Sequence, residues 1–175
     1  VHFSDDRGET WQAGAAAAMP TNEAQAVELA DGRLMLNMRT PGGHGCRMVA
    51  TSSDGGATWS EARDDRALIE PGCQASLIRW TSEAAGDDRD RLLFANPAST
   101  EQRTKMTVRL SYDEGESWPV ARLVNDEFCA YSCMTALPDG TAGLLYEHKS
   151  PDAGTPGLEH LLFARFNEAW LLGES

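Results

Sequence analysis

The stretch Ser52-Ser53-Asp54-Gly55-Gly56-Ala57-Thr58-Trp59 carries a pattern that occurs three times in the chain. The other copies cover residues 4–11 and 111–118, and all three fit S-x-D-x-G-x-[ST]-W. We expect the aspartate to accept hydrogen bonds from backbone N–H groups one and two residues on, the glycine to adopt a positive φ, and the tryptophan to pack onto a core. The pattern therefore predicts a self-locking β-turn in each copy.

The spacing of these boxes predicts the architecture. Their aspartates, Asp6, Asp54 and Asp113, are 48 and 59 residues apart. A repeat of roughly 40 to 60 residues with several short strands and one repeated turn is typical of a β-propeller blade. At about 45 to 50 residues per four-stranded blade, the 175 residues supply between three and four blades. Because the first box follows Val1 after only two further residues, we expect an incomplete ring that the chain enters in mid-blade.

Apolar or alternating runs bounded by turn residues predict the strands. We expect strands at residues 26–29, 33–39, 47–52, 75–80, 91–95, 106–110, 134–137, 141–147 and 160–166. Residues 168–172 are predicted as either a short helix or an edge strand. The resulting division of the chain is a truncated blade at 1–21 and then blades at 22–70, 71–125 and 126–175.

Charge and cysteine content exclude several kinds of partner. A net charge of −12 argues against nucleic acid or an anionic membrane surface, because both need a basic field, so an anionic ligand must be captured by local arginines. No apolar run approaches the roughly 20 residues that span a bilayer, and no signal-like segment stands at the start. The four cysteines show no C-x-x-C spacing. We therefore expect no structural zinc, and His44 beside Cys46 does not make a metal site.

Four residues with functional side chains stand out along the predicted strands. Glu23 lies at the entrance to the first strand of a blade, and Arg39 ends the second strand. Arg109 interrupts a strand-like run two residues before a box, and Tyr131 precedes the first strand of the last blade. Because the first strands of successive blades surround the axis of a propeller, equivalent positions are expected to converge there.

Several segments together resemble the second half of a bacterial exo-α-sialidase. They are Asn22-Glu23-Ala24-Gln25, Asn37-Met38-Arg39, Cys73-Gln74-Ala75-Ser76, Arg109 beside a box, Tyr131-Ser132 and Gly143-Leu144-Leu145-Tyr146-Glu147. The boxes resemble the Asp-boxes of that family, and motif order, spacing and box phase agree over essentially the whole chain. The resemblance implies an all-β fold, a six-bladed β-propeller of sialidase type, of which this chain supplies about three to three and a half blades.

The resemblance also implies an activity, the retaining hydrolysis of terminal sialic acids, and roles for the residues above. Sialic acid carries a carboxylate on its anomeric carbon, which repels a carboxylate nucleophile but not a neutral phenol. By similarity Tyr131 is the nucleophile and Glu23 is its base, because a phenol with a pKa near 10 is a poor nucleophile without one. Arg39 and Arg109 would clamp the substrate carboxylate, and Glu147 would orient the remaining arginine of a triad.

Two expected partners in this chemistry have no counterpart in the sequence. They are the first arginine of the triad and the acid/base aspartate, so the chain alone is expected to be inactive. The resemblance implies no metal or organic cofactor, sialylated glycans and the missing N-terminal half of the propeller as partners, and secretion. The alternative is a non-catalytic Asp-box propeller segment that binds a glycan or a protein. A Glu23 carboxyl within hydrogen-bond reach of the Tyr131 hydroxyl favours the enzyme.

Overall fold

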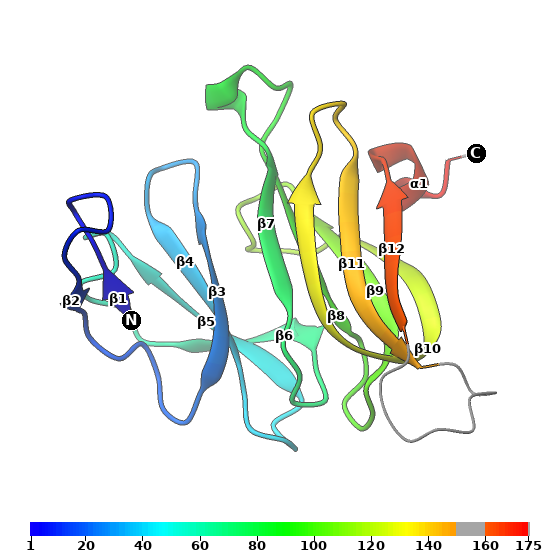
Figure 1. The fold of residues 1–175 in the computed structure, drawn as a ribbon, viewed down its shortest axis with the longest axis horizontal. Coiled ribbons are helices and arrows are strands. Elements are labelled where there is room, and N and C mark those ends of the chain that lie inside the picture. Colours follow the sequence, from blue (N-terminus) through cyan, green and yellow to red (C-terminus); the bar gives the residue numbers. More distant parts are fainter. Residues whose placement is uncertain (150–159, 175) are drawn as a thin grey trace.

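The computed structural model describes residues 1–149 and 160–174, so the last predicted blade, at 126–175, is described in part. The described chain is all β, as predicted, apart from one 3₁₀ turn and one short helix (Figure 1). Its elements are β1 (His2–Phe3), β2 (Gln12–Ala13), β3 (Asn22–Glu28), β4 (Leu34–Arg39), β5 (Cys46–Ser52), β6 (Arg63–Ile69), β7 (Ser76–Thr81), η1 (Glu83–Ala85), β8 (Arg91–Pro97), β9 (Thr104–Ser111), β10 (Val120–Ala136), β11 (Ala142–Lys149), β12 (His160–Phe166) and α1 (Glu168–Leu172).

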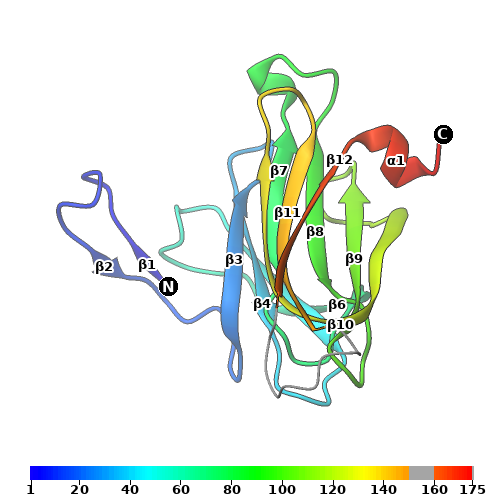
Figure 2. The same ribbon diagram turned by 45° about the vertical axis from the view of Figure 1, so that its right-hand side comes forward.

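The strands form antiparallel sheets in which chain order is also spatial order. β1 pairs with β2, β3 to β6 form a four-stranded sheet, and β7 to β12 form a six-stranded sheet. β7 contacts both β3 of the four-stranded sheet and β10 of its own sheet. Figures 1 and 2 show the two larger sheets standing beside each other, with the β1–β2 hairpin projecting at one end. β7, the first strand of the six-stranded sheet, therefore lies between β3, the first strand of the four-stranded sheet, and β10.

β10 joins two units within the six-stranded sheet, one made of β7 to β9 and the other of β11 and β12. Its first part pairs with β9, beginning at Val120 opposite Leu110, and its second part pairs with β11, ending at Ala136 opposite Ala142. One strand is thus the last of one unit and the first of the next. The predicted division at 22–70, 71–125 and 126–175 stays a prediction, and its last boundary falls inside this continuous strand.

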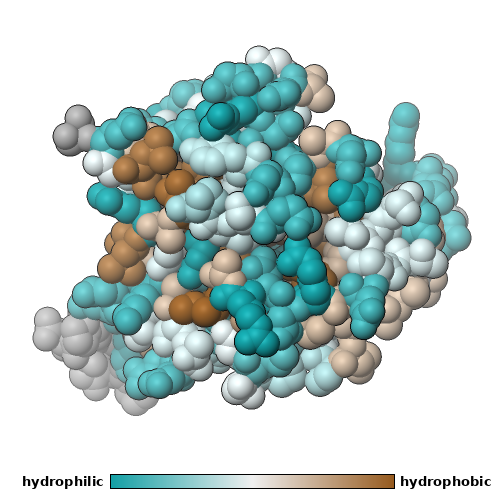
Figure 3. All heavy atoms as spheres, turned by 180° about the vertical axis from the view of Figure 1, so that it is seen from behind, coloured by the Kyte–Doolittle hydropathy of each residue, from teal (hydrophilic) through white to brown (hydrophobic). Residues whose placement is uncertain are grey.

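A shared apolar core fixes the position of the two larger sheets. It contains Met35 and Leu68 from the four-stranded sheet together with Leu77, Leu92 and Phe94 from the six-stranded sheet, each exposed by 2% or less. Truncating one such side chain to alanine typically costs about 2–5 kcal/mol. The approach of β3 to β7 is therefore set by close packing rather than by surface contacts. Seen from behind the view of Figure 1, the surface of the molecule is mostly hydrophilic with separate hydrophobic patches (Figure 3).

The C-terminal segment resolves the choice that the sequence left open, because residues 168–172 form the helix α1. Asn167 caps its first turn by accepting a hydrogen bond from the Trp170 N–H, and Gly173 ends it in the left-handed region at φ 77°. These are common residues at the two ends of a helix.

The three boxes form closely similar turns. In the second box, Asp54 Oδ1 accepts hydrogen bonds from the Ser52 hydroxyl (2.8 Å) and the Thr58 N–H (2.9 Å), while the Gly56 N–H donates to Ser52 Oγ (2.9 Å). The same contacts recur at residues 4–10 and 111–117. The positive φ of the glycines is confirmed, at 94° for Gly56. The predicted aspartate contacts are wrong, because each carboxylate accepts the backbone N–H of the residue four positions later, not of the residues one and two positions later.

The box tryptophans differ in how they pack. Trp118 is buried in the core between the sheets, where its indole N–H donates to Asp65 Oδ2 (3.1 Å). Trp59 packs partly buried against a smaller core on the other face of the four-stranded sheet. Trp11 is 65% exposed. The predicted packing onto a core is therefore confirmed for the third box and in part for the second, but not for the first.

The box aspartates predict a specific response to acid. Hydrogen bonds from Thr58 and Ser52 lower the pKa of Asp54 to about 2. A carboxylate whose pKa falls on folding stabilises the fold above its ordinary pKa of about 3.9, and this contribution is lost as the pH falls through the folded value. We expect Asp54→Ala to lower Tm at pH 7, and the difference from wild type to shrink between about pH 4 and pH 2.

Thermal melts at a series of pH values check this, with the exposed Asp126, outside the boxes, replaced by alanine as the control. A Tm difference for Asp54→Ala that stays constant down to pH 2 contradicts the prediction.

Candidate active site

Glu23 occupies a bulge at the start of β3. The pairing of β3 with β4 runs from Asn22 opposite Arg39 directly to Ala24 opposite Met38, so Glu23 is the unpaired extra residue. Its φ of 20° lies outside the usual range for a residue with a side chain. Bulges re-aim a side chain out of the regular alternation of a strand. The sequence places Glu23 correctly at a strand entrance but contains no sign of the bulge.

Tyr131 occupies a second bulge, on β10. The register with β11 passes from Cys129 opposite His148 to Ser132 opposite Tyr146, which leaves one extra residue on β10. Side chains from elsewhere replace the lost ladder bonds. The Tyr131 N–H donates to Glu147 Oε2 (3.0 Å), and the Ser132 N–H donates to Gln74 Oε1 (2.8 Å).

Gln74 supplies that oxygen from the connection between β6 and β7. Its Oε1 accepts the Ser132 N–H, and its Nε2 donates back to the Ser132 carbonyl oxygen (3.0 Å). One side-chain amide therefore satisfies both backbone groups of the residue that follows Tyr131. These paired bonds fix the backbone of Ser132, on one side of the tyrosine, while Glu147 fixes the backbone amide of Tyr131.

The two bulges aim their side chains at each other. The Tyr131 hydroxyl donates a hydrogen bond to Glu23 Oε1, across 108 residues of sequence. Arg39, from the end of β4, forms an ion pair with Glu23 Oε2 and lies 3.4 Å from the Tyr131 hydroxyl oxygen. The structure thus brings Glu23, Arg39 and Tyr131 together, and we call these three residues the tyrosine cluster. Glu147 contacts this cluster through the Tyr131 N–H.

The contacts in this cluster set its protonation. Burial alone raises the pKa of Glu23, but hydrogen bonds from Tyr131 and Arg39 outweigh burial and hold that pKa below its usual range. The hydrogen bond to Glu23 raises the pKa of the Tyr131 phenol above its ordinary value, and burial adds to the shift. At neutral pH the resting site therefore holds a carboxylate, a neutral phenol and a guanidinium.

Arg103 is a member of the site that the sequence analysis missed. Its guanidinium carbon lies 5.7 Å from the centre of the Tyr131 ring, and its charge contributes to the lowered pKa of Glu23. It lies directly before β9, in the connection that follows β8, the second strand of the β7–β9 unit. Arg39 ends β4, the second strand of the preceding β3–β6 unit. A strand-end rule alone gives Pro97, the last residue of β8, so finding Arg103 needs a search of the whole connection between the second and third strands.

Arg109, which the sequence analysis grouped with Arg39, lies elsewhere. It is in the middle of β9, 7% exposed, and donates to Asn96 Oδ1 (3.1 Å). Burial lowers the pKa of its guanidinium. The structure does not bring Arg109 to the cluster, because its strand position turns the side chain into the sheet packing rather than to the strand ends.

Open space borders the cluster on two sides. A cavity of about 240 Å³ is lined by Tyr131, Glu147 and neighbouring residues of β10 to β12. Another of about 300 Å³ is lined by Glu23 and by residues of β4 and the segment before β3. Tyr131 itself is 37% exposed. The phenol oxygen can therefore be approached by a ligand, and two cations stand beside it.

One group of side chains in the described part of the chain has metal-ligand character. The ligand atoms of His44, Cys46 and Asp64 all lie within 4.8 Å of one another. His44 Nε2 already lies 2.8 Å from Asp64 Oδ1, and burial raises the pKa of the Cys46 thiol, which keeps the thiol protonated at neutral pH. His44 and Asp64 are therefore partners of each other, and no residue of this group belongs to the tyrosine cluster.

Comparison with known proteins gives one consistent result. A family model described as a BNR repeat-like domain matches residues 1–144. A curated sialidase of Micromonospora viridifaciens is 44% identical over 173 residues, which are 98% of this chain and 25% of that protein. A sialidase of Bacteroides fragilis is 40% identical over 151 residues, 84% of this chain and 28% of that protein. The chain thus spans about a quarter of the length of these relatives.

Solved structures agree with these matches. The Hadza microbial sialidase Hz136 superposes with a TM-score of 0.78 and 35% identity, covering 97% of this chain and 32% of that chain. A leech intramolecular trans-sialidase complexed with 2,7-anhydro-Neu5Ac gives a TM-score of 0.82 and 28% identity, covering 98% and 28%. These likenesses confirm the predicted fold as part of a sialidase-type β-propeller.

The Tyr131–Glu23 contact predicts an observable titration. We expect the Tyr131 phenol to ionise above the ordinary tyrosine pKa of about 10, and Glu23→Gln to bring its pKa back toward that value, because the amide no longer stabilises the neutral phenol as an anion does. Absorbance titration, referenced to Tyr131→Phe, measures this.

A matched control comes from a second tyrosine–glutamate pair, Tyr112 with Glu168 (2.8 Å), at the other end of the sheet. Glu168→Gln should leave the titration of Tyr131 unchanged. An equal effect of both substitutions on Tyr131 contradicts the assignment.

Proposed function

The chain belongs to the sialidase family, and we propose that it carries the nucleophile of a retaining exo-α-sialidase that hydrolyses terminal sialic acids on glycoconjugates. The observation that carries this proposal is the hydrogen bond from the Tyr131 hydroxyl to Glu23. A catalytic nucleophile that is weak at neutral pH needs a base within hydrogen-bond reach, and a glycan-binding segment without catalysis does not. The geometry therefore favours the enzyme over the non-catalytic alternative.

The proposed first step uses the phenol because of the charge on the substrate. Tyr131 Oη attacks the anomeric carbon, its proton passes to Glu23, and the bond from that carbon to the leaving oxygen breaks. The leaving oxygen takes a proton from an acid that we assign to a part of the protein outside this chain. Water then attacks the same carbon and gives one proton to the deprotonated acid, which restores that acid. The phenol oxygen leaves and recovers its proton from Glu23, and the configuration is retained overall.

Two arginines are proposed to bind the substrate carboxylate. Arg39 and Arg103 both lie beside Tyr131, and a planar guanidinium offers paired donors to a carboxylate. We assign Arg103 the role that the sequence analysis gave to Arg109. We likewise assign Glu147 to holding the backbone of Tyr131, because its carboxylate accepts the Tyr131 N–H, instead of orienting an arginine.

The setting of the whole protein also stays a proposal. Sialylated glycans are the proposed substrates, and the remaining part of a sialidase propeller is the proposed structural partner. Secretion is a further proposal that follows from the family. In the described ranges, 1–149 and 160–174, the helices lack the length and apolar character of a membrane-spanning segment.

Kinetics with a fluorogenic sialoside test the nucleophile and its base, using the protein at its natural length. We expect Tyr131→Phe to abolish the retaining reaction, and Glu23→Gln to lower kcat about 10²–10⁴-fold, the usual range for loss of a general base. Tyr112→Phe, which removes the other tyrosine–glutamate hydrogen bond, should leave kcat unchanged. Wild-type activity that survives Tyr131→Phe in full contradicts the assignment.

The two arginines can be separated in the same assay. Arg103→Lys is expected to lower kcat/KM about tenfold to a hundredfold, since hydrogen bonds to charged groups contribute about 1.5–3 kcal/mol. Arg109→Lys is expected to leave kcat/KM of the folded protein unchanged and to lower Tm, because Arg109 is buried against Asn96. The reverse pattern would restore Arg109 to the site.

A further inference from the structure

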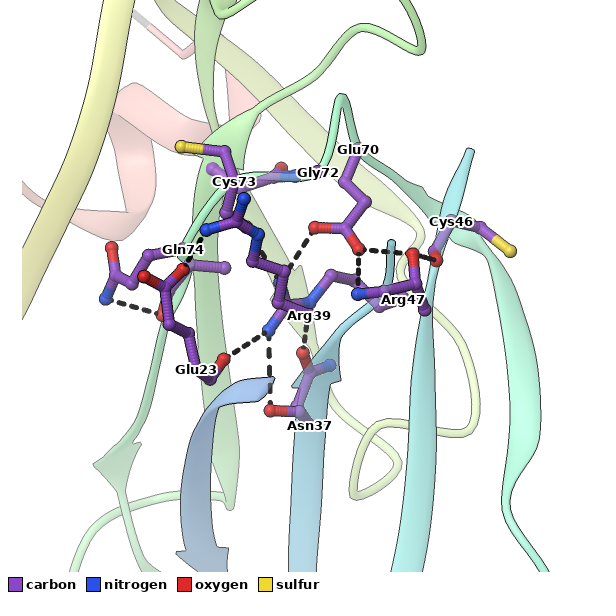
Figure 4. A network of polar contacts seen from close by, with 12 residues as sticks. Glu23, Asn37, Arg39, Cys46, Arg47, Glu70, Gly72, Cys73 and Gln74 are labelled. Atoms are coloured by element: carbon purple, nitrogen blue, oxygen red, sulfur yellow. Dashed lines mark hydrogen bonds and ion pairs between the residues drawn. The ribbon is translucent and has the colours of Figure 1, made fainter. Parts of the chain in front are cut away.

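Directly beneath the cluster lies an ion pair without access to solvent. The side chains of Arg47 and Glu70 are both 0% exposed, and Arg47 Nη1 lies 2.8 Å from Glu70 Oε2. Removing two charges from water is costly, and well-packed apolar residues in the same place are often as stable or more so. A gain in stability is therefore a poor account of this pair. What the pair holds in place is more informative (Figure 4).

The guanidinium of Arg47 bonds to backbone on two sides of the site. Nη1 donates to the Cys73 carbonyl oxygen (2.9 Å), and Nη2 donates to the carbonyl oxygen of Glu23 itself (3.4 Å). Nε donates to Asn37 Oδ1 (2.7 Å), which fixes the plane of the group. One planar side chain thus ties the bulge in β3 to the connection between β6 and β7.

The carboxylate of Glu70 reaches a third segment. Its Oε1 accepts the N–H of Thr40 (2.7 Å), the residue directly after Arg39 at the end of β4. On the other side, Cys73 is followed by Gln74, whose amide holds both backbone groups of Ser132, next to Tyr131. Every member of the tyrosine cluster is therefore at most two residues from a backbone group that this network holds.

We propose that the buried Arg47–Glu70 pair is the positioning device of the site, which sets the backbone of Glu23, Arg39 and Tyr131 so that the three side chains meet. Arg47 and Glu70 are positioning residues and touch no substrate. Glu23 needs such support, because it is excluded from the strand ladder and has a φ that a side chain disfavours. The effect on catalysis rests on the proposed sialidase function, whereas the effect on geometry does not.

The test replaces both charges at once, because removing one partner alone leaves a buried, uncompensated charge. The variant is Arg47→Met with Glu70→Gln. Its matched control is Arg91→Met with Glu168→Gln, which removes another ion pair of a largely buried arginine (2.7 Å) at the opposite end of the sheet. Arg47→Lys is the second test variant, since it keeps the charge but loses the fork of donors that reaches the backbone of Glu23 and Cys73.

The first readout is the phenol titration of Tyr131, which needs no activity. The groups that face this phenol are Glu23, Arg39 and Arg103. We expect the pKa of Tyr131 to fall toward its ordinary value in both Arg47 variants and to stay at the wild-type value in the control. A Tyr131 titration that is unchanged in folded Arg47 variants overturns the proposal.

The second readout is the kinetics of sialoside hydrolysis in the protein at its natural length. A displaced nucleophile and base lower kcat, and a shift of the order of 1 Å can cost up to about a hundredfold. We expect kcat to fall about tenfold or more in the Arg47 variants, and the control to change Tm but not kcat. Wild-type protein without hydrolysis would refute the proposed function alone, because the titration still decides the positioning role.

Discussion

The hydrogen bond between Tyr131 and Glu23 can form only because β3 and β10 stand on either side of β7. The two residues are 108 positions apart, in different sheets, and neither sheet could present both. The apolar core shared by the sheets sets their approach, and the turns of the boxes close the connections at the other ends of the strands. The packing of the sheets thus brings together the start of β3, the end of β4 and the bulge in β10.

The electrostatics of that point follow from how the carboxylate is shared. Glu23 accepts a hydrogen bond from the phenol and pairs with Arg39, so its charge is stabilised without full exposure to water. The hydrogen bond to Glu23 raises the pKa of Tyr131 and keeps the proton on the phenol in the resting state, although Arg39 acts on this pKa in the opposite direction. In the proposed reaction the proton crosses an existing hydrogen bond. The nearby guanidinium of Arg103 adds positive charge where an anionic substrate would bind.

The sequence predicts most of the strands, but it gives no bounds for β6 and only the last residues of β10. The misses in the strands and in the cluster have physical causes. Strand ends place Glu23 and Arg39 correctly, because Glu23 lies at the start of β3 and Arg39 ends β4. The sequence predicts that Tyr131 precedes a strand, but it lies inside the continuous strand β10, at a bulge that no local pattern shows. Arg109 also lies in a periodic run, but alternation alone does not tell a rim position from a buried one, and Asn96 is its partner inside the sheet. Bulges, and a network such as Arg47 with Glu70, depend on contacts between distant segments that no local pattern contains.

The most direct test of the central claim is to trap the proposed covalent intermediate. The reagent is a sialic acid with fluorine next to the anomeric carbon and a good leaving group on that carbon. Fluorine slows both steps by disfavouring the oxocarbenium-like transition state, while the leaving group keeps attack faster than release. After incubation with the protein at its natural length, peptide mass spectrometry should find one sialyl adduct, on Tyr131. An adduct on another residue, or turnover with inverted configuration and no adduct, would contradict the account.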